Sequence, residues 1–157
     1  MCLPPPANVL SIAVGRRRVK NTQPQRGEYM AVRILAADAD PVMLEIYRSY
    51  FPHFGYEIET TSDVEQCLGR LREFVPEVMI LNLELAVGGG EGVLAALRQD
   101  ISIPLVPVVL TTAEVGPGNL VRYLVPPVVK LLEKPFRLSE LRASVMGATP
   151  TRLVESA

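Results

Sequence analysis

The sequence predicts an α/β fold: a five-stranded parallel sheet, doubly wound, with helices on both faces. Three observations support this. Short apolar runs alternate with segments of helical periodicity over about 120 residues. Some of these runs are continuously apolar, as in strands that helices cover on both faces. Gly, Pro and Asp residues separate the segments, which is typical of turns and helix caps.

The first predicted strand covers 32–37, a mostly apolar run that ends at Asp38. Asp40 and Pro41 then indicate a helix start, because Asp is a favoured N-cap and Pro suits the first helical position. Apolar residues follow at helical spacing as far as Tyr50. This part of the chain therefore predicts one strand followed directly by one helix.

The second unit begins with a short alternating strand over 56–60. Ser62 and Glu65 form a capping-box pattern, which predicts that Ser62 caps the second helix. Cys67 lies on the apolar face of this helix, so we expect a core residue rather than a reactive thiol. Pro76 then ends the helix, because proline is not tolerated in a helix interior.

Three more strands are predicted, over 78–81, 106–110 and 128–132. A loop of three glycines at 88–90 leads from the first of these strands into a helix. Prolines ahead of the last strand leave room for only about two helical turns. Apolar residues at helical spacing from Leu138 onwards predict a final helix.

Polar residues follow four of the predicted strands. Sheets of this kind bind ligands at the carboxyl ends of their strands, where the strand order reverses. The residues at these ends are Asp38, Asn82, Thr112 and Lys134. We therefore expect these four side chains to form the candidate site.

The order and spacing of these segments resemble a response-regulator receiver domain, from about residue 32 to 145. Asn82 precedes Thr112 by 30 residues and Lys134 by 52, which fits that family. The resemblance implies a flavodoxin-like receiver fold and a place in two-component phosphorelay signalling. The segments that carry it are ILAADADP at 34–41, PEVMILNL at 76–83, PVVLTTA at 107–113 and EKPF at 133–136.

The family's phosphorylation chemistry is only partly matched. In receiver domains an acidic pair after the first strand helps to bind Mg²⁺, and an Asp after the third strand accepts a phosphoryl group from a histidine kinase. A Thr or Ser and a Lys, here Thr112 and Lys134, contact the phosphoryl oxygens. This sequence has Asn82 at the acceptor position and Ala39 at the second acidic position. The pattern predicts a degenerate pocket.

We expect no cofactor and no dedicated Mg²⁺ site, since Mg²⁺ takes oxygen ligands and usually one or two carboxylates. The remaining candidate ligands are Asp38, Asp40 and Glu84, of which Asp40 is better explained as a helix cap. We expect Lys134 to form a structural ion pair with Asp38. The Asn82 amide is expected to donate to Asp38 and to accept from Lys134.

These features favour a pseudo-receiver, a signalling module rather than an enzyme, that works by protein–protein contact without Asp phosphorylation. A histidine kinase, another regulator or a second copy of the chain is the expected partner. The candidate contact residues are Leu120, Tyr123, Leu124 and Leu131.

Two alternatives remain open. One is a working receiver that is phosphorylated in a non-standard way, for instance on Thr111, Thr112 or Ser62. The other is a flavodoxin-like domain that binds a nucleotide or flavin through the glycines at 88–90. That loop has neither the Lys-Ser/Thr of a P-loop nor a dinucleotide-binding spacing.

The formal net charge of −1 conceals an asymmetry. Residues 1–30 carry five basic side chains and one acidic side chain, whereas 31–157 is net acidic. We expect 1–30 to be a proline-containing tail, disordered or an artefact of the start site, since Gly-Glu before Met30 can be encoded by a ribosome-binding sequence. Residues 31–147 form the receiver-like domain and 148–157 a short tail.

Composition excludes several other classes of protein. Two cysteines and one histidine cannot build a disulfide framework or a zinc site. No run is long and apolar enough for a transmembrane helix, so we expect no membrane contact. A nucleic-acid partner is expected at most for the basic tail. These features fit a cytoplasmic protein.

Overall fold

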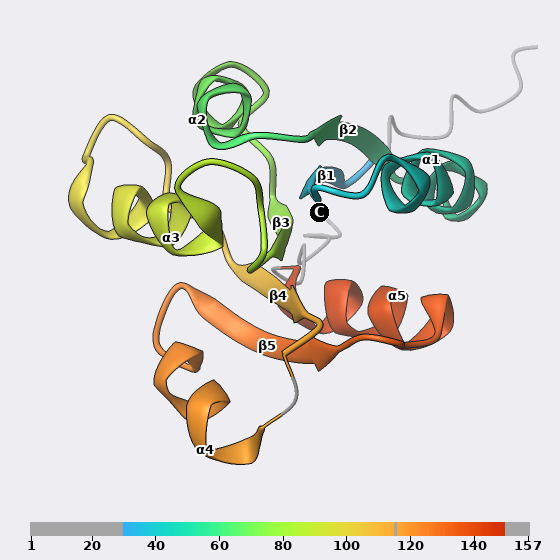
Figure 1. The fold of residues 1–157 in the computed structure, drawn as a ribbon. Coiled ribbons are helices and arrows are strands. Elements are labelled where there is room, and N and C mark those ends of the chain that lie inside the picture. Colours follow the sequence, from blue (N-terminus) through green and yellow to red (C-terminus); the bar gives the residue numbers. More distant parts are fainter. Residues whose placement is uncertain (1–29, 115, 150–157) are drawn as a thin grey trace, which may run out of the picture.

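The structure, a computed structural model, describes residues 30–114 and 116–149. In these ranges five parallel strands form one sheet in the order β2-β1-β3-β4-β5 (Figure 1). The predicted α/β fold class is confirmed. The strands are β1 (Arg33–Ala37), β2 (Glu57–Thr61), β3 (Val78–Asn82), β4 (Val108–Thr112) and β5 (Val128–Glu133).

Helices cover both faces of the sheet. In Figure 1, α1 and α5 lie on one side, and α2, α3 and α4 lie on the other. Two short 3₁₀ helices, η1 (Phe51–Phe54) and η2 (Val121–Tyr123), extend α1 and α4. The α-helices are α1 (Pro41–Tyr50), α2 (Val64–Glu73), α3 (Gly89–Gln99), α4 (Pro117–Leu120) and α5 (Leu138–Ala148).

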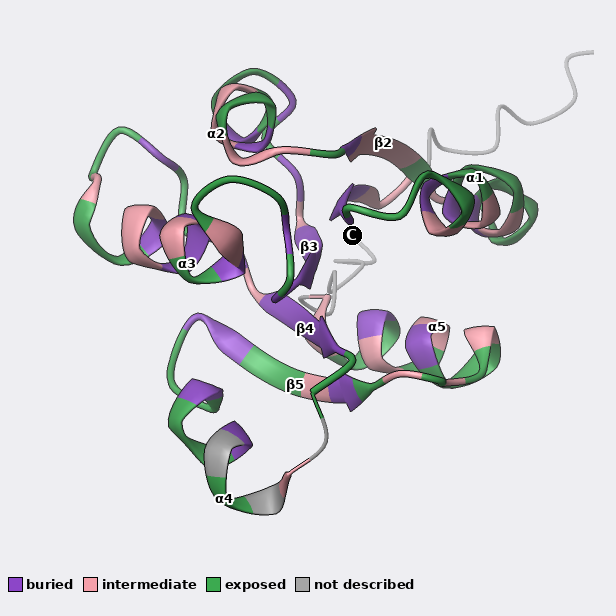
Figure 2. Cartoon of the chain, viewed as in Figure 1, coloured by how far each residue is buried: buried purple, intermediate pink, exposed green. Residues whose placement is uncertain are grey.

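Alternate residues of the strands supply two hydrophobic cores. In β1, Ile34 and Ala36 pack with the residues of α1 and α5, whereas Leu35 and Ala37 pack with those of α2 and α3. All residues of β3 and β4 are buried, as Figure 2 shows for the centre of the sheet. Covering on both faces explains why these strands are continuously apolar in the sequence.

The helix starts show one correct and one incorrect prediction. Asp40 caps α1, since its side chain accepts a hydrogen bond from the Val42 amide at 2.9 Å. The prediction that Ser62 caps α2 is wrong. Asp63 is the cap, and its carboxylate accepts from the Gln66 amide at 2.8 Å. Ser62 lies one residue too early for its side chain to take this role.

The predicted bounds of β4 are wrong by two residues. Val106 is buried in the core but lies before the strand, which begins at Val108. Pro107 has no N–H and cannot donate to the sheet ladder, although its carbonyl accepts from Met79. The shift brings Thr111 and Thr112 into the carboxyl end of β4, next to the end of β3.

The short connection before β5 agrees with the sequence, since α4 and η2 together span only Pro117–Tyr123. The predicted domain boundary at 147 falls inside the last turn of α5, which ends at Ala148. The predicted tails, 1–30 and 148–157, lie almost entirely outside the described residues. Every helix within the described ranges is too short or too polar to cross a bilayer.

Candidate functional site

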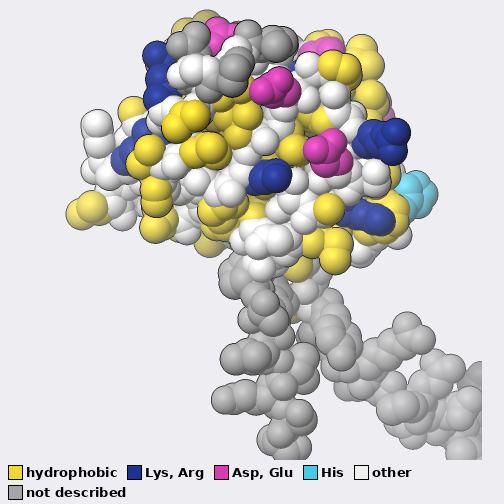
Figure 3. Space-filling model, turned by 90° about the horizontal axis from the view of Figure 1, so that it is seen from below, with side chains coloured by type: hydrophobic (Ala, Val, Ile, Leu, Met, Phe, Trp, Pro, Cys, Tyr) yellow, Lys and Arg dark blue, Asp and Glu magenta, His cyan; other side chains and the backbone are white. Residues whose placement is uncertain are grey.

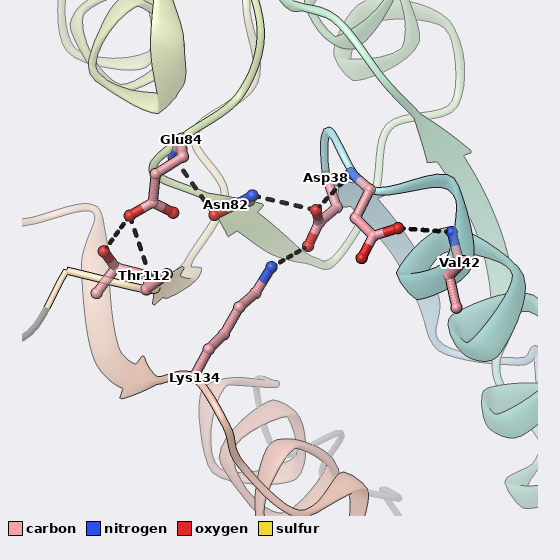
Figure 4. Close-up of polar contacts among 8 residues, drawn as sticks. Asp38, Val42, Asn82, Glu84, Thr112 and Lys134 are labelled. Atoms are coloured by element: carbon pink, nitrogen blue, oxygen red, sulfur yellow. Dashed lines mark hydrogen bonds and ion pairs between the residues drawn. The ribbon is translucent and has the colours of Figure 1, made fainter.

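Asp38 lies at the centre of a polar cluster where the carboxyl ends of the strands meet (Figure 4). Its side chain is 1% exposed. Oδ2 accepts a hydrogen bond from Lys134 Nζ at 2.9 Å, and this ion pair joins the end of β1 to the segment after β5. Oδ1 accepts from the Asp40 amide at 2.9 Å. The predicted Asp38–Lys134 pair is confirmed.

Asn82 is the last residue of β3, and both polar atoms of its side chain form hydrogen bonds. Its Nδ2 donates to Asp38 Oδ1 at 3.1 Å, as predicted. Its Oδ1 accepts from the backbone amide of Glu84 at 3.3 Å. The expected acceptance from Lys134 is wrong: the Lys134 ammonium group binds Asp38 Oδ2, and the Asn82 oxygen accepts from the amide two residues ahead. The Asn82 side chain is thereby oriented by its own loop and by Asp38.

Glu84 reaches from the loop after β3 to the end of β4. Its Oε1 accepts from the Thr112 hydroxyl at 2.5 Å and from the Ala113 amide at 3.1 Å. The Thr112 hydroxyl also accepts from the Glu114 amide at 3.0 Å. Glu84 is an exposed loop residue, and the sequence suggested it only as a weak candidate metal ligand, so these contacts were not predicted. The only available signal was its position two residues after Asn82.

The acidic residues do not fit a magnesium site as they are arranged. Asp38 uses both oxygens on donors of the protein, and Asp40 caps α1. Glu84 binds the start of the loop after β4, and Ala39 has no side-chain oxygen. Within the described ranges, no three His, Cys, Asp or Glu side chains lie close enough to hold a metal ion. Magnesium takes oxygen ligands that are free to coordinate.

One buried phenol lies near the carboxylates. Burial, and to a lesser extent the charges of Asp38 and Asp40, raise the pKa of Tyr47 above its ordinary value. The Tyr47 hydroxyl has no hydrogen-bond partner among the described residues. It therefore stays neutral at physiological pH and adds no charge to the cluster. Among the described residues, Lys134 is the cation that pairs with Asp38.

The predicted contact residues on α4 and β5 are only partly exposed. Leu120 and Tyr123 are 5% and 7% exposed and belong to the core that α2 and α3 share, so their prediction as surface contacts is wrong. Leu120 ends α4, and Tyr123 ends η2 and donates its hydroxyl proton to Glu91 on α3. Leu131 packs partly against the same core. Leu124 remains exposed, at 52%.

The family profile of the response regulator receiver domain matches residues 34–146. The chain belongs to the receiver domain family of response regulators. The resemblance seen in the sequence is thus confirmed for nearly all of the described residues.

Curated relatives of this receiver include a DNA-binding response regulator and a transcriptional regulatory protein. The DNA-binding response regulator MtrA of Mycolicibacterium smegmatis is 32% identical over 116 residues, which cover 74% of this chain and 50% of MtrA. TrcR of Mycobacterium tuberculosis is 24% identical over 122 residues, 78% of this chain and 47% of TrcR. The chain spans about half the length of the curated relatives that it matches.

Solved structures show the same fold. The chemotaxis protein CheY4 of Vibrio cholerae superposes with a TM-score of 0.68 at 21% identity, over 75% of this chain and 98% of CheY4. The receiver domain of Francisella response regulator 1452 superposes with a TM-score of 0.68 at 22% identity, over 74% of this chain and 94% of that domain. At these identities the likeness concerns the fold alone.

Proposed function

We propose that this receiver domain signals by protein–protein contact without phosphorylation at the acceptor position. One observation carries the proposal. The side chain at that position is the Asn82 amide, which donates to the buried Asp38 at 3.1 Å. An amide has no nucleophilic oxygen anion to attack a phosphoryl donor. Instead, the Asn82 amide and the Lys134 ammonium group both bind the Asp38 carboxylate.

The same contacts support the proposal that the pocket works without Mg²⁺ or another cofactor. A receiver that needs Mg²⁺ gathers several anionic oxygens, which repel one another until a cation binds. Here Asp38 has an ammonium group and two N–H donors around it. The chain thus supplies a counter-ion for Asp38 from within, and we propose a signalling role rather than an enzymatic one.

The partner is proposed to be a histidine kinase, another response regulator or a second copy of this chain. Figure 3 views the face on which α4, β5 and α5 lie, and apolar side chains are spread over it between charged groups. We propose that Leu124, which is exposed, contacts the partner. It is accompanied by three further exposed apolar residues, Val125, Val129 and Met146.

The described structure gives less support to the alternatives. Thr111 and Thr112 are fully buried, so a kinase has no access to their hydroxyls in this conformation. The glycine loop packs on its own backbone, where a Cβ at Gly90 would lie 2.7 Å from the Asn82 carbonyl oxygen. The tight packing at Gly90 therefore accounts for one of these glycines without a phosphate. Ser62 is exposed and stays available for modification.

Intact-mass spectrometry after incubation with acetyl phosphate and Mg²⁺ tests the proposal. Wild type, Asn82→Asp and Asn82→Ala are compared. We expect no phosphoryl adduct on wild type or on Asn82→Ala. Asn82→Asp replaces the N–H donor with a second carboxylate next to Asp38, so we expect Mg²⁺ to raise its melting temperature and to permit an adduct.

The adduct chemistry decides between the hypotheses. An acid-labile adduct on wild type contradicts the proposal, because acyl phosphates hydrolyse in acid. An acid-stable adduct on wild type favours the alternative of Ser or Thr modification, and Ser62→Ala would remove it if that hydroxyl is the site. Absence of an adduct on all three variants would mean that the loss of the second acidic residue, at Ala39, is enough to prevent the reaction.

A further inference from the structure

We infer that the Glu84 carboxylate replaces the phosphoryl group in this receiver and holds the start of the loop after β4 in place. Glu84 lies on the loop after β3, and Figure 4 shows its side chain directed toward Thr112. The inference rests on the proposed function, because a replacement is needed only where the acceptor position carries no phosphoryl group.

The contacts of Thr112 show why Glu84 can take this role. A threonine hydroxyl has one proton to donate, and here the proton goes to Glu84 Oε1. A lone pair of the same hydroxyl accepts from the Glu114 amide at 3.0 Å. The hydroxyl is therefore oriented on both sides. In the family this threonine contacts a phosphoryl oxygen, which is also an anionic acceptor.

A second donor converges on the same carboxylate oxygen. The Ala113 amide donates to Glu84 Oε1 at 3.1 Å. One oxygen of Glu84 thus binds a side-chain hydroxyl and the next backbone N–H along the chain. Bonds to an ionised acceptor are about twice as strong as neutral ones. This geometry is that of a small anion site that the protein fills itself.

Lys134, the other residue that contacts the phosphoryl group in the family, also binds a group of the protein itself. Lys134 Nζ pairs with Asp38 at 2.9 Å and so is not directed at Glu84. The Lys134 ammonium group therefore binds the Asp38 carboxylate, and the Thr112 hydroxyl binds the Glu84 carboxylate. A phosphoryl group is accordingly not needed to order either side chain.

The consequence concerns the segment that leads to α4. Ala113 and Glu114 are the first residues after β4, and both amides take part in the bonds around Glu84 and Thr112. These bonds tie the loop after β3 to the loop after β4, across residues that are 28 and 29 apart in the sequence. The amides of Ala113 and Glu114, at the start of this segment, are thereby held in one arrangement without phosphorylation.

Amide hydrogen exchange of the full, unphosphorylated chain, followed by NMR, tests the inference. The variants are Glu84→Ala and Glu84→Gln, and the control is Glu65→Gln, an exposed glutamate on α2. We expect the Ala113 N–H of Glu84→Ala to exchange roughly tenfold faster or more, as for loss of a charge-assisted hydrogen bond. Glu84→Gln keeps an acceptor oxygen without the charge, so we expect a smaller acceleration. The control should match wild type.

Chemical rescue separates a phosphoryl replacement from a merely structural contact. Inorganic phosphate is titrated into Glu84→Ala, and the Ala113 amide shift is followed. We expect a saturable shift in Glu84→Ala and none in wild type, where Glu84 occupies the position. Absence of the shift in Glu84→Ala overturns the inference. Unchanged Ala113 exchange in Glu84→Ala, or wild-type exchange in Glu84→Gln, overturns it as well.

The outcome is distinguishable from failure of the proposed function. An acid-labile adduct on wild type contradicts the proposed function, whatever the exchange of Ala113 shows. Fast Ala113 exchange in wild type without any adduct contradicts the inference alone. The two measurements use the same chain but report on different atoms, the side chain at position 82 and the amide at position 113.

Discussion

Asn82 places an amide group where receiver domains have the carboxylate of an aspartate. A carboxylate at this position would face the Asp38 carboxylate across about the 3.1 Å that now separates the Asn82 amide from it. Two carboxylates at that distance repel each other, whereas an amide N–H donates. The change therefore converts a contact that needs a cation into one that needs none, and leaves Lys134 as the partner of Asp38.

Lys134→Ala is expected to destabilise the domain. The substitution leaves Asp38, which is 1% exposed, without its counter-ion. Losing one partner of a fully buried pair costs about 3–5 kcal/mol. We expect the lower end of this range or less here, because the Lys134 side chain is 22% exposed. Thermal unfolding followed by circular dichroism should show a melting temperature several degrees lower than that of wild type.

Lys130→Ala serves as the matched control for this prediction, since Lys130 is an exposed lysine on β5. We expect it to change the melting temperature very little. Equal melting curves for Lys134→Ala and wild type would show that the ion pair does not stabilise the fold.

The junction of β3 and α3 sets the position of Asn82. Gly90 lies in the first turn of α3, and its amide donates to the Leu83 carbonyl at 2.9 Å. A Cβ on Gly90 would lie 2.7 Å from the Asn82 carbonyl oxygen and 2.8 Å from Leu83 Cα. Both atoms belong to the backbone, so relief requires a shift of the strand end. The glycine is needed for this close approach.

Gly90→Ala is therefore expected to lower the free energy of unfolding, by about 1–3 kcal/mol as for other overpacked positions. Gly92→Ala is the control in the same helix, where an added Cβ meets nothing within 4 Å. We expect that variant to be more stable by up to about 1 kcal/mol, because alanine favours a helix. Urea denaturation measures both, and the same sign for both changes would contradict this account.

The start of α2 illustrates how a sequence pattern can mislead at the scale of an element. Both Ser62 and Asp63 are good N-cap residues, and the Glu65 spacing favoured Ser62. In the structure Asp63 has the extended backbone of a cap and binds the Gln66 amide. Which of two neighbouring residues caps a helix depends on where the helix begins after the preceding strand. Here β2 ends at Thr61 and α2 begins at Val64, so Asp63 is the cap.

At the scale of the whole molecule, the two cores on either side of the sheet depend on each other, because the same strands form both. Cys67 is fully buried in the core beneath α2, as the sequence predicted. Burial raises the pKa of its thiol from 9.0 to about 12. The nucleophilic thiolate is therefore scarce in the folded protein at neutral pH.

Thiol labelling of Cys67 should report on opening of the fold. In a Cys2→Ser background, Cys67 is the only remaining thiol. We expect Ellman's reagent to leave the native protein unmodified at pH 8 over minutes and to label it fully in denaturant. Rapid labelling under native conditions would contradict burial of this thiol.

The raised thiol pKa also has a consequence for stability at alkaline pH. Between pH 9 and about 12 the folded state retains the Cys67 proton while the unfolded chain loses it. The unfolded state then binds fewer protons, so the free energy of unfolding falls as pH rises through this window. Cys67→Ala should lack this part of the decline, as pH-dependent urea denaturation can measure.

Much of the architecture follows from patterns that are local in the chain. The helical periodicity, the Asp40–Pro41 start of α1 and the apolar strands predicted the elements, because these depend on near neighbours and on burial of one face. Parallel strands then place their carboxyl ends together, so Asp38, Asn82 and Lys134 could be expected to meet. The opposite charges of Asp38 and Lys134 then predicted the ion pair between them.

Other features depend on how loops and short helices pack, and no periodicity encodes them. Glu84 binds Thr112, 28 residues away, because the loop after β3 lies next to the carboxyl end of β4. Leu120 and Tyr123, on α4 and η2, are buried in the core that α2 and α3 share. Contacts of this kind are set by the relative placement of distant segments, so they appear only once the chain has folded.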